Sequence, residues 1–466
     1  MFDLIIRGGT LVTPAGQARA TLAIANGVIK AVAPPGEAMS GALDVDASDR
    51  LIFPGLVDAH VHIPGYLLST RLEDFASATT AAALGGVTTL MLMPTDDPRT
   101  ATGSYFSRKR DIGERYSHVD FAIQALIGPR TEREDIDEMA DLGAISFELF
   151  LAYGGNPGFI IGHDDFELRR LMEVVREVGR VVGVTPHSAS LIAKLTERQK
   201  LFEETRKHRE VFEKEKARPP VQVFSLTRPT LSEGLGIARA CVVAAETGTK
   251  IHLRALSSSH SVGIVNRFRD VVALSSEVMS HHLLFVAEEA HRLGPYGVIV
   301  PPIRTGEERD SLRRALRDGD IDMVVSDHSP VLREDKEPGW ADIWKTPPGM
   351  PGLQTLFASM LALVEDGALS LEDVARCCAE RPAAGFGLYP KKGALQVGSD
   401  ADLIVVDPAR PTLIDDSTQR SKANYTTLKG RSINSRIESV YLRGRLIAHQ
   451  DQMVSEPTGR FVRPSP

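Results

Sequence analysis

The segment LVDAHVH at residues 56–62 is bounded by Pro-Gly pairs on both sides, at residues 54–55 and 64–65. An apolar run between turn residues predicts a short buried strand. Side chains alternate between the two faces of a strand, so His60 and His62 point the same way. Neutral imidazole is the commonest metal ligand, and this segment therefore predicts a metal site at the end of the strand.

Composition limits the class of protein. The chain has 466 residues, of which 42% are hydrophobic, and this length favours one large domain with a smaller one beside it. The formal net charge of −7 gives no reason to expect a nucleic acid or an anionic membrane as partner. Three cysteines make no disulfide framework, and they fit a reducing compartment. With no signal-peptide pattern and no apolar run near the roughly 20 residues of a membrane span, we expect a cytoplasmic protein.

The two ends of the chain share a β-rich pattern. Short strands are predicted at residues 4–9 and 22–27 near the start, and at residues 402–407 and 437–444 near the end. These segments are expected to form one composite β-sandwich from residues 1–53 and 388–466.

Residues 54–387 follow a different pattern, in which strand-like apolar runs alternate with helical ones. Examples of the strand-like runs are residues 87–93, 121–127 and 181–184. Alternation of this kind predicts parallel βα units, and about eight such units fit this length. The predicted fold class is therefore α/β, a (β/α)8 TIM barrel with a small β-sandwich domain built from both chain ends.

Active-site residues of such a barrel lie at the carboxyl ends of its strands. Glu148 is a charge inside an apolar run, and a buried carboxylate needs a partner or a metal. His187 follows another predicted strand, and His252 lies on a third, with Arg254 on the same strand face. Asp327 closes the run before His-Ser-Pro, where a carboxylate is placed to touch a metal and to take a proton from water as general base.

Several further segments combine with these residues into one ordered pattern. They lie at residues 73–75, 85–94, 228–233, 277–284, 301–304, 326–330, 349–353 and 398–405. In this order the pattern resembles the amidohydrolase superfamily, in its cyclic amidohydrolase branch of dihydroorotases, hydantoinases (dihydropyrimidinases) and allantoinases. The resemblance covers nearly the whole chain, and although each segment alone is a weak signal, their order is specific.

The resemblance implies a metal centre at the barrel mouth. One divalent ion, usually zinc, would be held by His60, His62 and Asp327, and a second by two further histidines, with manganese as the alternative metal. In the family a carbamylated lysine bridges the two ions, and a hydroxide between them attacks a cyclic amide carbonyl. The resemblance also implies a homo-oligomer, a dimer or a tetramer.

Two of the departures from the family pattern concern expected metal ligands. Glu148 stands where the bridging lysine belongs, and glutamate is several bonds shorter than a carbamylated lysine. Glu148 therefore bridges two ions through a closer backbone, holds one ion only, or does not ligate. Aligning the sixth strand on the following serines puts Ala255 at the family's histidine position, whereas aligning it on His252 turns His252 and Arg254 inward together.

We expect a metal-dependent hydrolase that opens a cyclic amide, imide or ureide. The expected metal ligands are His60, His62, Glu148, His187, His252 and Asp327. Tyr153 and Arg254 are the expected substrate-binding residues, Tyr153 because it occupies the position of a substrate-contacting tyrosine in hydantoinases. The alternatives are a non-catalytic relative that serves as scaffold or oligomer subunit, and a single-metal hydrolase of a non-cyclic amide.

Overall fold

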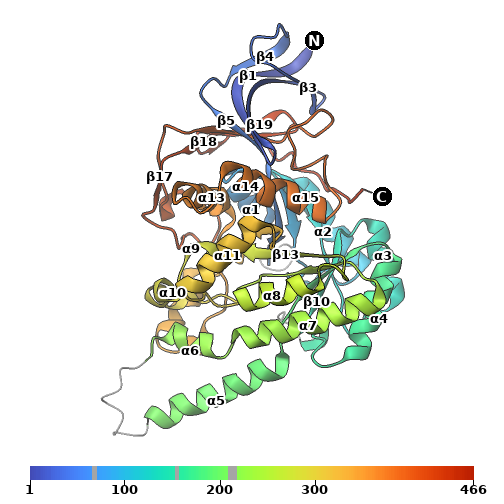
Figure 1. Cartoon of the computed structure of the whole chain (residues 1–466), viewed down its shortest axis with the longest axis vertical. Coiled ribbons are helices and arrows are strands. Elements are labelled where there is room, and N and C mark those ends of the chain that lie inside the picture. Colours follow the sequence, from blue (N-terminus) through green and yellow to red (C-terminus); the bar gives the residue numbers. More distant parts are fainter. Residues whose placement is uncertain (66–70, 153–156, 208–217, 466) are drawn as a thin grey trace.

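The computed structural model describes residues 1–65, 71–152, 157–207 and 218–465. Within these residues, eight parallel strand positions form a closed barrel, with the third divided into β8 and β9. In Figure 1 the N-terminal strands β1 (Phe2–Thr13), β3 (Val28–Ala33) and β4 (Gly41–Asp46) lie at the top of the molecule, above the helices of this barrel. A bridge between Val61 and His328 joins the last strand to the first. The barrel strands are β6 (Leu56–Val61), β7 (Val87–Leu92), β8 (Asp120–Ile123), β9 (Ala125–Leu126), β10 (Ser146–Phe150), β11 (Val181–Thr185), β12 (Ile251–Leu253), β13 (Leu274–Met279) and β14 (Met323–Val325). The predicted barrel is confirmed.

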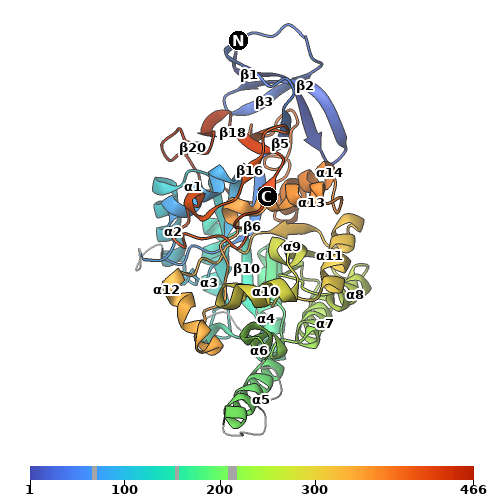
Figure 2. The same cartoon turned by 90° about the vertical axis from the view of Figure 1, so that its left-hand side faces the viewer.

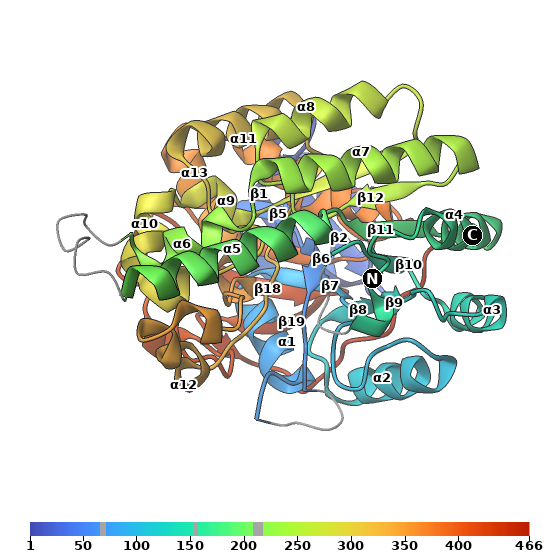
Figure 3. The same ribbon diagram turned by 90° about the horizontal axis from the view of Figure 1, so that it is seen from below.

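Helices surround the barrel strands, as the view in Figure 3 shows. Several begin at a residue whose side chain accepts a backbone N–H, such as Asp74 before α1 and Asp164 before α4. The helices are α1 (Phe75–Leu84), α2 (Gly103–Tyr116), α3 (Arg133–Leu142), α4 (Asp165–Glu177), α5 (Ala189–Lys207), α6 (Pro220–Leu226), α7 (Thr230–Thr247), α8 (Ser259–Phe268), α9 (Ser280–Leu284), α10 (Ala287–Leu293), α11 (Gly306–Asp318), α12 (Arg333–Lys336), α13 (Leu356–Glu365), α14 (Leu371–Ala375) and α15 (Arg381–Gly385). No helix in the described part of the chain has the length and apolar character needed to cross a bilayer.

A second sheet combines the two ends of the chain. Its main path runs β20-β19-β18-β15-β5-β1-β2-β3, with β4 paired to β1. In the described part of the chain, β5 pairs with β1 on one edge and antiparallel with β15 on the other, and this second pairing joins the two ends. A bridge between Val28 and Asp400 adds a further link. The strands are β1 (Phe2–Thr13), β2 (Gly16–Ala25), β3 (Val28–Ala33), β4 (Gly41–Asp46), β5 (Leu51–Pro54), β15 (Leu403–Asp407), β18 (Arg436–Leu442), β19 (Arg445–His449) and β20 (Gln452–Met453), while β16 (Thr412–Leu413) and β17 (Ser432–Ile433) form a separate pair. In Figure 2 the N-terminal strands lie at the end of the molecule opposite α5.

A buried ionic cluster connects the terminal sheet to the barrel. The Nζ of Lys392 lies 2.5 Å from Asp120 on β8, 2.9 Å from Asp400 and 2.8 Å from Asp402. All four side chains are buried, and we call them the Lys392 cluster. Arg443 pairs with Asp120 from the other side. Because its members come from β8 and from the segment leading into β15, the cluster fixes the position of the sheet on the barrel.

Candidate active site

A cavity of about 520 Å³ opens at the carboxyl ends of the barrel strands. Its wall includes His60 and His62 from β6 and the residue after it, His187 beyond β11, and Asp327 beyond β14. Apolar side chains such as Phe150 and Val331 complete the wall, and the loop at 347–349 forms part of the rim. This is the location that the barrel architecture predicts for an active site.

Three of the expected ligands converge in this wall. One ligand atom from each of His60, His62 and Asp327 lies within 4.8 Å of the other two. Asp327 Oδ1 is 3.2 Å from Nε2 of both histidines. We call these three residues the metal group.

The second nitrogen of each imidazole is held by a neighbour. His60 Nδ1 lies 2.5 Å from Glu277 Oε1, and His62 Nδ1 lies 2.8 Å from Thr95 Oγ1. In metal sites, a ligating histidine usually donates its other N–H to a carboxylate or a similar acceptor, which orients the ring. Two histidines and one carboxylate, oriented in this way, fit a divalent ion such as zinc.

The electrostatics of the metal group follow from burial and mutual contact. Burial lowers the pKa of His60, but the carboxylates of Glu277 and Asp327 outweigh it and raise that pKa overall. For His62 burial dominates over the attraction of Asp327, and the pKa is lowered. Burial raises the pKa of Asp327, yet the two imidazoles outweigh it, so the pKa of Asp327 is lowered and the carboxylate stays ionised.

The backbone turns sharply where β14 ends. Asp327 has φ of 43°, the left-handed region, which aspartate tolerates better than most residues at a cost of about 1–2 kcal/mol. Hydrogen bonds on both sides hold this turn: the Ser326 N–H donates to Asp58 Oδ1 at 3.2 Å, and the His62 N–H donates to the His328 carbonyl at 2.9 Å. The strained conformation turns the Asp327 carboxylate toward the two histidines.

His187 lies in the same wall but not in the metal group. Its side chain is buried, and burial together with the charges of Arg304 and Arg228 lowers its pKa to about 3. The imidazole is therefore neutral at physiological pH, which is the form that ligates metals. Its role as a ligand stays a prediction.

Glu148 lies in an environment different from the one expected of a bridging ligand. Arg254 donates to both of its carboxylate oxygens, from Nε at 3.1 Å to Oε2 and from a terminal nitrogen at 2.7 Å to Oε1. Ser146 Oγ also donates to Oε1 at 2.8 Å. Both Glu148 and Arg254 are fully buried, and the structure does not bring Glu148 into the metal group. Its short side chain ends beside Arg254, which favours the third alternative, that Glu148 does not ligate.

His252 and Arg254 both point into the barrel, as the second alignment of the sixth strand predicts. His252 Nε2 lies 2.9 Å from Glu277 Oε2, and its Nδ1 lies 2.8 Å from Ser275 Oγ. Its side chain is buried and does not reach the metal group. Arg254 contributes to the cavity floor, but its guanidinium is paired with Glu148 and Glu277, so contact with substrate requires it to exchange those partners. Tyr153, the other expected substrate contact, lies outside the described residues.

The sequence reasoning missed Glu277, which contacts both His60 and His252. Burial raises the pKa of Glu277, but His60 and Arg254 outweigh it and hold that pKa well below its usual range. The signal was present, because Glu277 is a single charge within the strand sequence LSSEVM, the same pattern that drew attention to Glu148.

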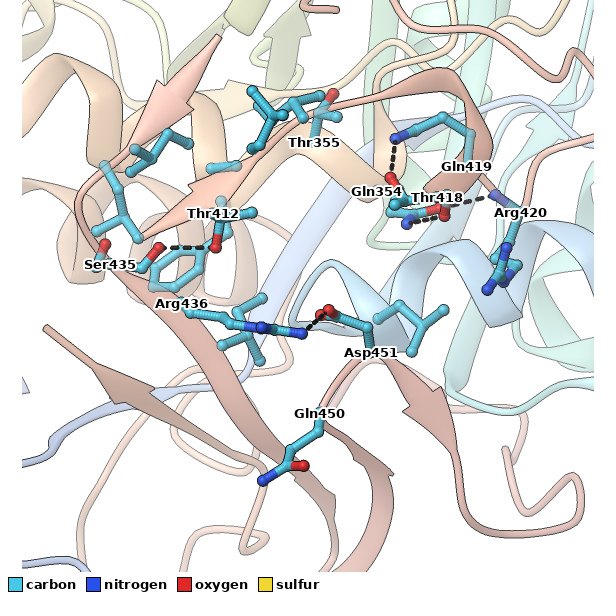
Figure 4. A pocket seen from close by; sticks show the side chains of 18 of the residues that line it. Gln354, Thr355, Thr412, Thr418, Gln419, Arg420, Ser435, Arg436, Gln450 and Asp451 are labelled. Atoms are coloured by element: carbon cyan, nitrogen blue, oxygen red, sulfur yellow. Dashed lines mark hydrogen bonds and ion pairs between the residues drawn. The ribbon is translucent and has the colours of Figure 1, made fainter. Parts of the chain in front are cut away.

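A second cavity lies away from this chemistry. It measures about 330 Å³ and is enclosed by α1, α13 and the segments around β16 and β17. Figure 4 shows that several of its polar residues are bonded within the wall: Arg436 with Asp451, Thr412 with the Ser435 carbonyl, and Gln354 with Thr418 and Arg420. Among the described residues, neither group of potential metal ligands lies in this wall.

Comparison with known proteins agrees with this geometry. A profile described as the amidohydrolase family matches residues 51–447. The chain is 31% identical over 466 residues to an L-hydantoinase of Paenarthrobacter aurescens, covering 99% of this chain and 98% of that one. It is 34% identical over 470 residues to an allantoinase of Rubrobacter xylanophilus, with the same coverage of 99% and 98%. The solved structure of an L-hydantoinase (dihydropyrimidinase) from Arthrobacter aurescens superposes with a TM-score of 0.93 at 30% identity, covering 99% of this chain and 100% of that one. The resemblance inferred from the ordered motifs is thus confirmed, and this chain belongs to the amidohydrolase family.

Proposed function

We propose that this protein is a metal-dependent hydrolase that opens the C–N bond of a cyclic amide, imide or ureide. The observation that carries the proposal is the convergence of His60, His62 and Asp327 in the wall of one cavity at the barrel mouth. Zinc fits this donor set, with manganese as the alternative. When bound, the ion polarises the amide oxygen and lowers the pKa of water so that hydroxide is available near neutral pH.

The side chains at the barrel mouth have separate roles in metal binding and in proton transfer. His60, His62 and Asp327 would hold the ion, with Glu277 and Thr95 fixing the orientation of the two imidazole rings. Asp327, kept ionised by the two imidazoles, accepts a proton from the attacking water as general base. It then returns this proton as general acid to the leaving nitrogen, because an amide nitrogen departs only when protonated.

The cavity supports a small cyclic substrate. Its volume of about 520 Å³ is in the range of small-molecule sites, and apolar residues such as Phe150, Val300 and Val331 can pack against a ring. The relatives are named hydantoinases and allantoinases, and hydantoin and allantoin share a five-membered cyclic ureide ring. We therefore rank five-membered cyclic ureides first among the candidate substrates.

The test is a substrate panel assayed with zinc and with manganese. Hydantoin, allantoin, dihydrouracil, succinimide and dihydroorotate are each incubated with the metal-loaded protein, and ring opening is followed. We expect turnover of at least one ureide, loss of turnover on chelation, and recovery when metal is returned. Protein that holds no divalent metal after gentle purification would contradict the proposal.

The pairing of Glu148 with Arg254 supports a second candidate, a relative that keeps the fold without catalysis and serves as a scaffold or oligomer subunit. No turnover across the panel by metal-loaded protein would favour it. By the family resemblance we also infer a dimer or a tetramer. From the sequence we infer that the protein works in the cytoplasm, because its three cysteines fit a reducing compartment. Light scattering after size-exclusion chromatography tests the number of subunits.

A further inference from the structure

Below the metal group lies a buried network of charges centred on Arg254. Its guanidinium donates to both oxygens of Glu148, to Glu277 Oε2 at 2.9 Å, and to the Ala59 carbonyl at 3.0 Å. Gln124 Oε1 accepts a further bond from it. We call Arg254, Glu148 and Glu277 the arginine network, and all three side chains are at most 1% exposed.

The fold provides space for this network at Gly183. Glu148, Gly183 and His252 are aligned across β10, β11 and β12. A Cβ on Gly183 would lie 2.1 Å from Glu148 Oε2, so the carboxylate occupies the volume that any other residue would fill. The missing side chain lets Glu148 reach across β11 toward Arg254. The ion pair of Glu148 with Arg254 therefore depends on the glycine at position 183 in the barrel interior.

From this arrangement we infer that the barrel mouth holds one divalent ion, that Arg254 supplies the second positive charge of the site, and that Glu277 positions His60 for the ion. The inference rests on the proposed function, since it concerns the same metal group. It differs from the two-ion centre that the family resemblance implies.

Two of the ligands expected of a second ion, Glu148 and His252, are already engaged, which leaves His187 as the remaining expected ligand in the cavity wall. Glu148 could bridge two ions only by giving up both bonds from Arg254, which would leave the buried guanidinium with three of its five hydrogen bonds. His252 is likewise held between Glu277 and Ser275. The family's alternative histidine position is Ala255, which carries no ligand atom.

The charges of the buried side chains around the metal group also favour a single divalent ion. Glu148, Glu277 and Asp327 carry three negative charges and Arg254 one positive charge, so one divalent ion makes the group neutral. A second divalent ion would bring two further positive charges, of which the hydroxide between the ions would balance one, and an excess charge in a buried site is costly.

Glu277 connects the arginine network to the metal group. One of its oxygens accepts from His60 Nδ1 at 2.5 Å and the other from Arg254 at 2.9 Å. Arg254 fixes the carboxylate, the carboxylate fixes the imidazole ring, and Nε2 is left facing Asp327. Glu277 is thus a positioning residue, and loss of such a partner weakens metal binding about 10–100-fold in other sites.

The first experiment counts ions. Metal-free protein is titrated with cobalt, whose absorption reports coordination, and the zinc content of the reloaded protein is measured by elemental analysis. We expect saturation at one equivalent per chain. Two tightly bound equivalents would overturn the inference and leave the proposed function intact, whereas no bound metal would overturn the proposed function itself.

The second experiment tests Glu277 with a matched control. Glu277→Gln keeps the shape of the side chain and removes its charge, and we expect the Kd for cobalt and zinc to rise about 10–100-fold. Glu233→Gln is the control, because Glu233 is equally buried but bonds to Ser257 and Arg304, away from the metal group. Both variants are expected to melt at lower temperature, and only Glu277→Gln is expected to change metal affinity. Equal affinities in the two variants would overturn the positioning role, and the ion count of the unaltered protein tests the inference even if a variant fails to fold.

Discussion

The Lys392 cluster and the metal group each contain three side chains that can ligate a metal, but they differ in the source of positive charge. In the Lys392 cluster a lysine ammonium lies within 2.9 Å of all three aspartates. In the metal group, Asp327 Oδ1 faces two imidazoles. The guanidinium of Arg254 does not pair with this carboxylate, because it is bonded to Glu148 and Glu277. A cluster of residues that can ligate a metal therefore indicates a metal site only when no lysine or arginine of the chain already neutralises it.

The largest expected effect comes from removing the carboxylate of the metal group. Asp327→Asn keeps the size of the side chain but can neither accept the proton from water nor balance the charge of an ion. We expect turnover of the best ureide to fall by about 10²–10⁴-fold, with a weaker affinity for zinc. Steady-state kinetics and metal content measure both. Unchanged turnover with full metal content would remove Asp327 from the mechanism.

The second-largest effect is expected from removing the lysine ammonium of the Lys392 cluster. Lys392→Ala leaves the buried Asp120, Asp400 and Asp402 without their shared ammonium, although Arg443 still pairs with Asp120, and we expect the free energy of unfolding to fall by about 3–5 kcal/mol. Added calcium or manganese should raise the melting temperature of this variant more than that of the unaltered protein, because the vacated cluster can then take an ion. Equal responses to these ions in both proteins would show that three clustered aspartates are not sufficient for binding.

A smaller effect on stability is expected at Gly183, where the absence of a side chain leaves space for the Glu148 carboxylate that pairs with Arg254. Gly183→Ala would place a methyl group 2.1 Å from the Glu148 carboxylate, and we expect a loss of about 1–3 kcal/mol in the free energy of unfolding. Gly263→Ala is the matched control, because a Cβ there meets no atom within 4 Å and alanine favours the helix. Denaturant unfolding compares the two. Equal stability of the two variants would mean that Glu148 can move without cost.

The smallest effect concerns a histidine that belongs to neither group. His282 has its pKa lowered to about 3 by burial and by the charges of Arg304 and His281. Between pH 6.5 and 3 the unfolded chain binds a proton that the folded chain does not, so the stability contributed by this group falls as the pH drops. The loss is about 1.4 kcal/mol per pH unit below 6.5. The His282→Gln variant lacks this titrating group, so its free energy of unfolding should fall less on going from pH 7.5 to pH 5.5 than that of the unaltered protein. Denaturant unfolding at the two pH values measures the difference.

Much of the fold and part of the site were predictable because the relevant signals are local. Alternating strand and helix patterns predicted the barrel, and the alternation of side chains placed His60 and His62 on one face. The position of Asp327 after an apolar run placed it at the mouth. Each of these inferences depends only on residues that are neighbours in sequence and on the shared geometry of parallel strands.

The environment of Glu148 was not predictable in this way. Its pairing with Arg254 depends on the register of β10, β11 and β12, and on the absence of a side chain at Gly183 between them. The backbone after β12 also turns, since Ala255 has φ of 53°, so the alternation of side chains along β12 does not extend from His252 to Ala255. Three-dimensional packing decides which carboxylate pairs with which cation. The sequence alone did not distinguish among several carboxylates and cations that could form such a pair.

The pairing of β5 with β15 has a consequence for biosynthesis. While the ribosome is still making the barrel, β5 has its first neighbour, β1, but its other edge has no strand to pair with until Leu403–Asp407 emerge. At about 5–20 residues per second, this interval lasts on the order of tens of seconds. An unpaired edge of this kind is a template for association with other nascent chains. Translation that stalls before residue 403 should therefore yield a product that aggregates through its N-terminal sheet.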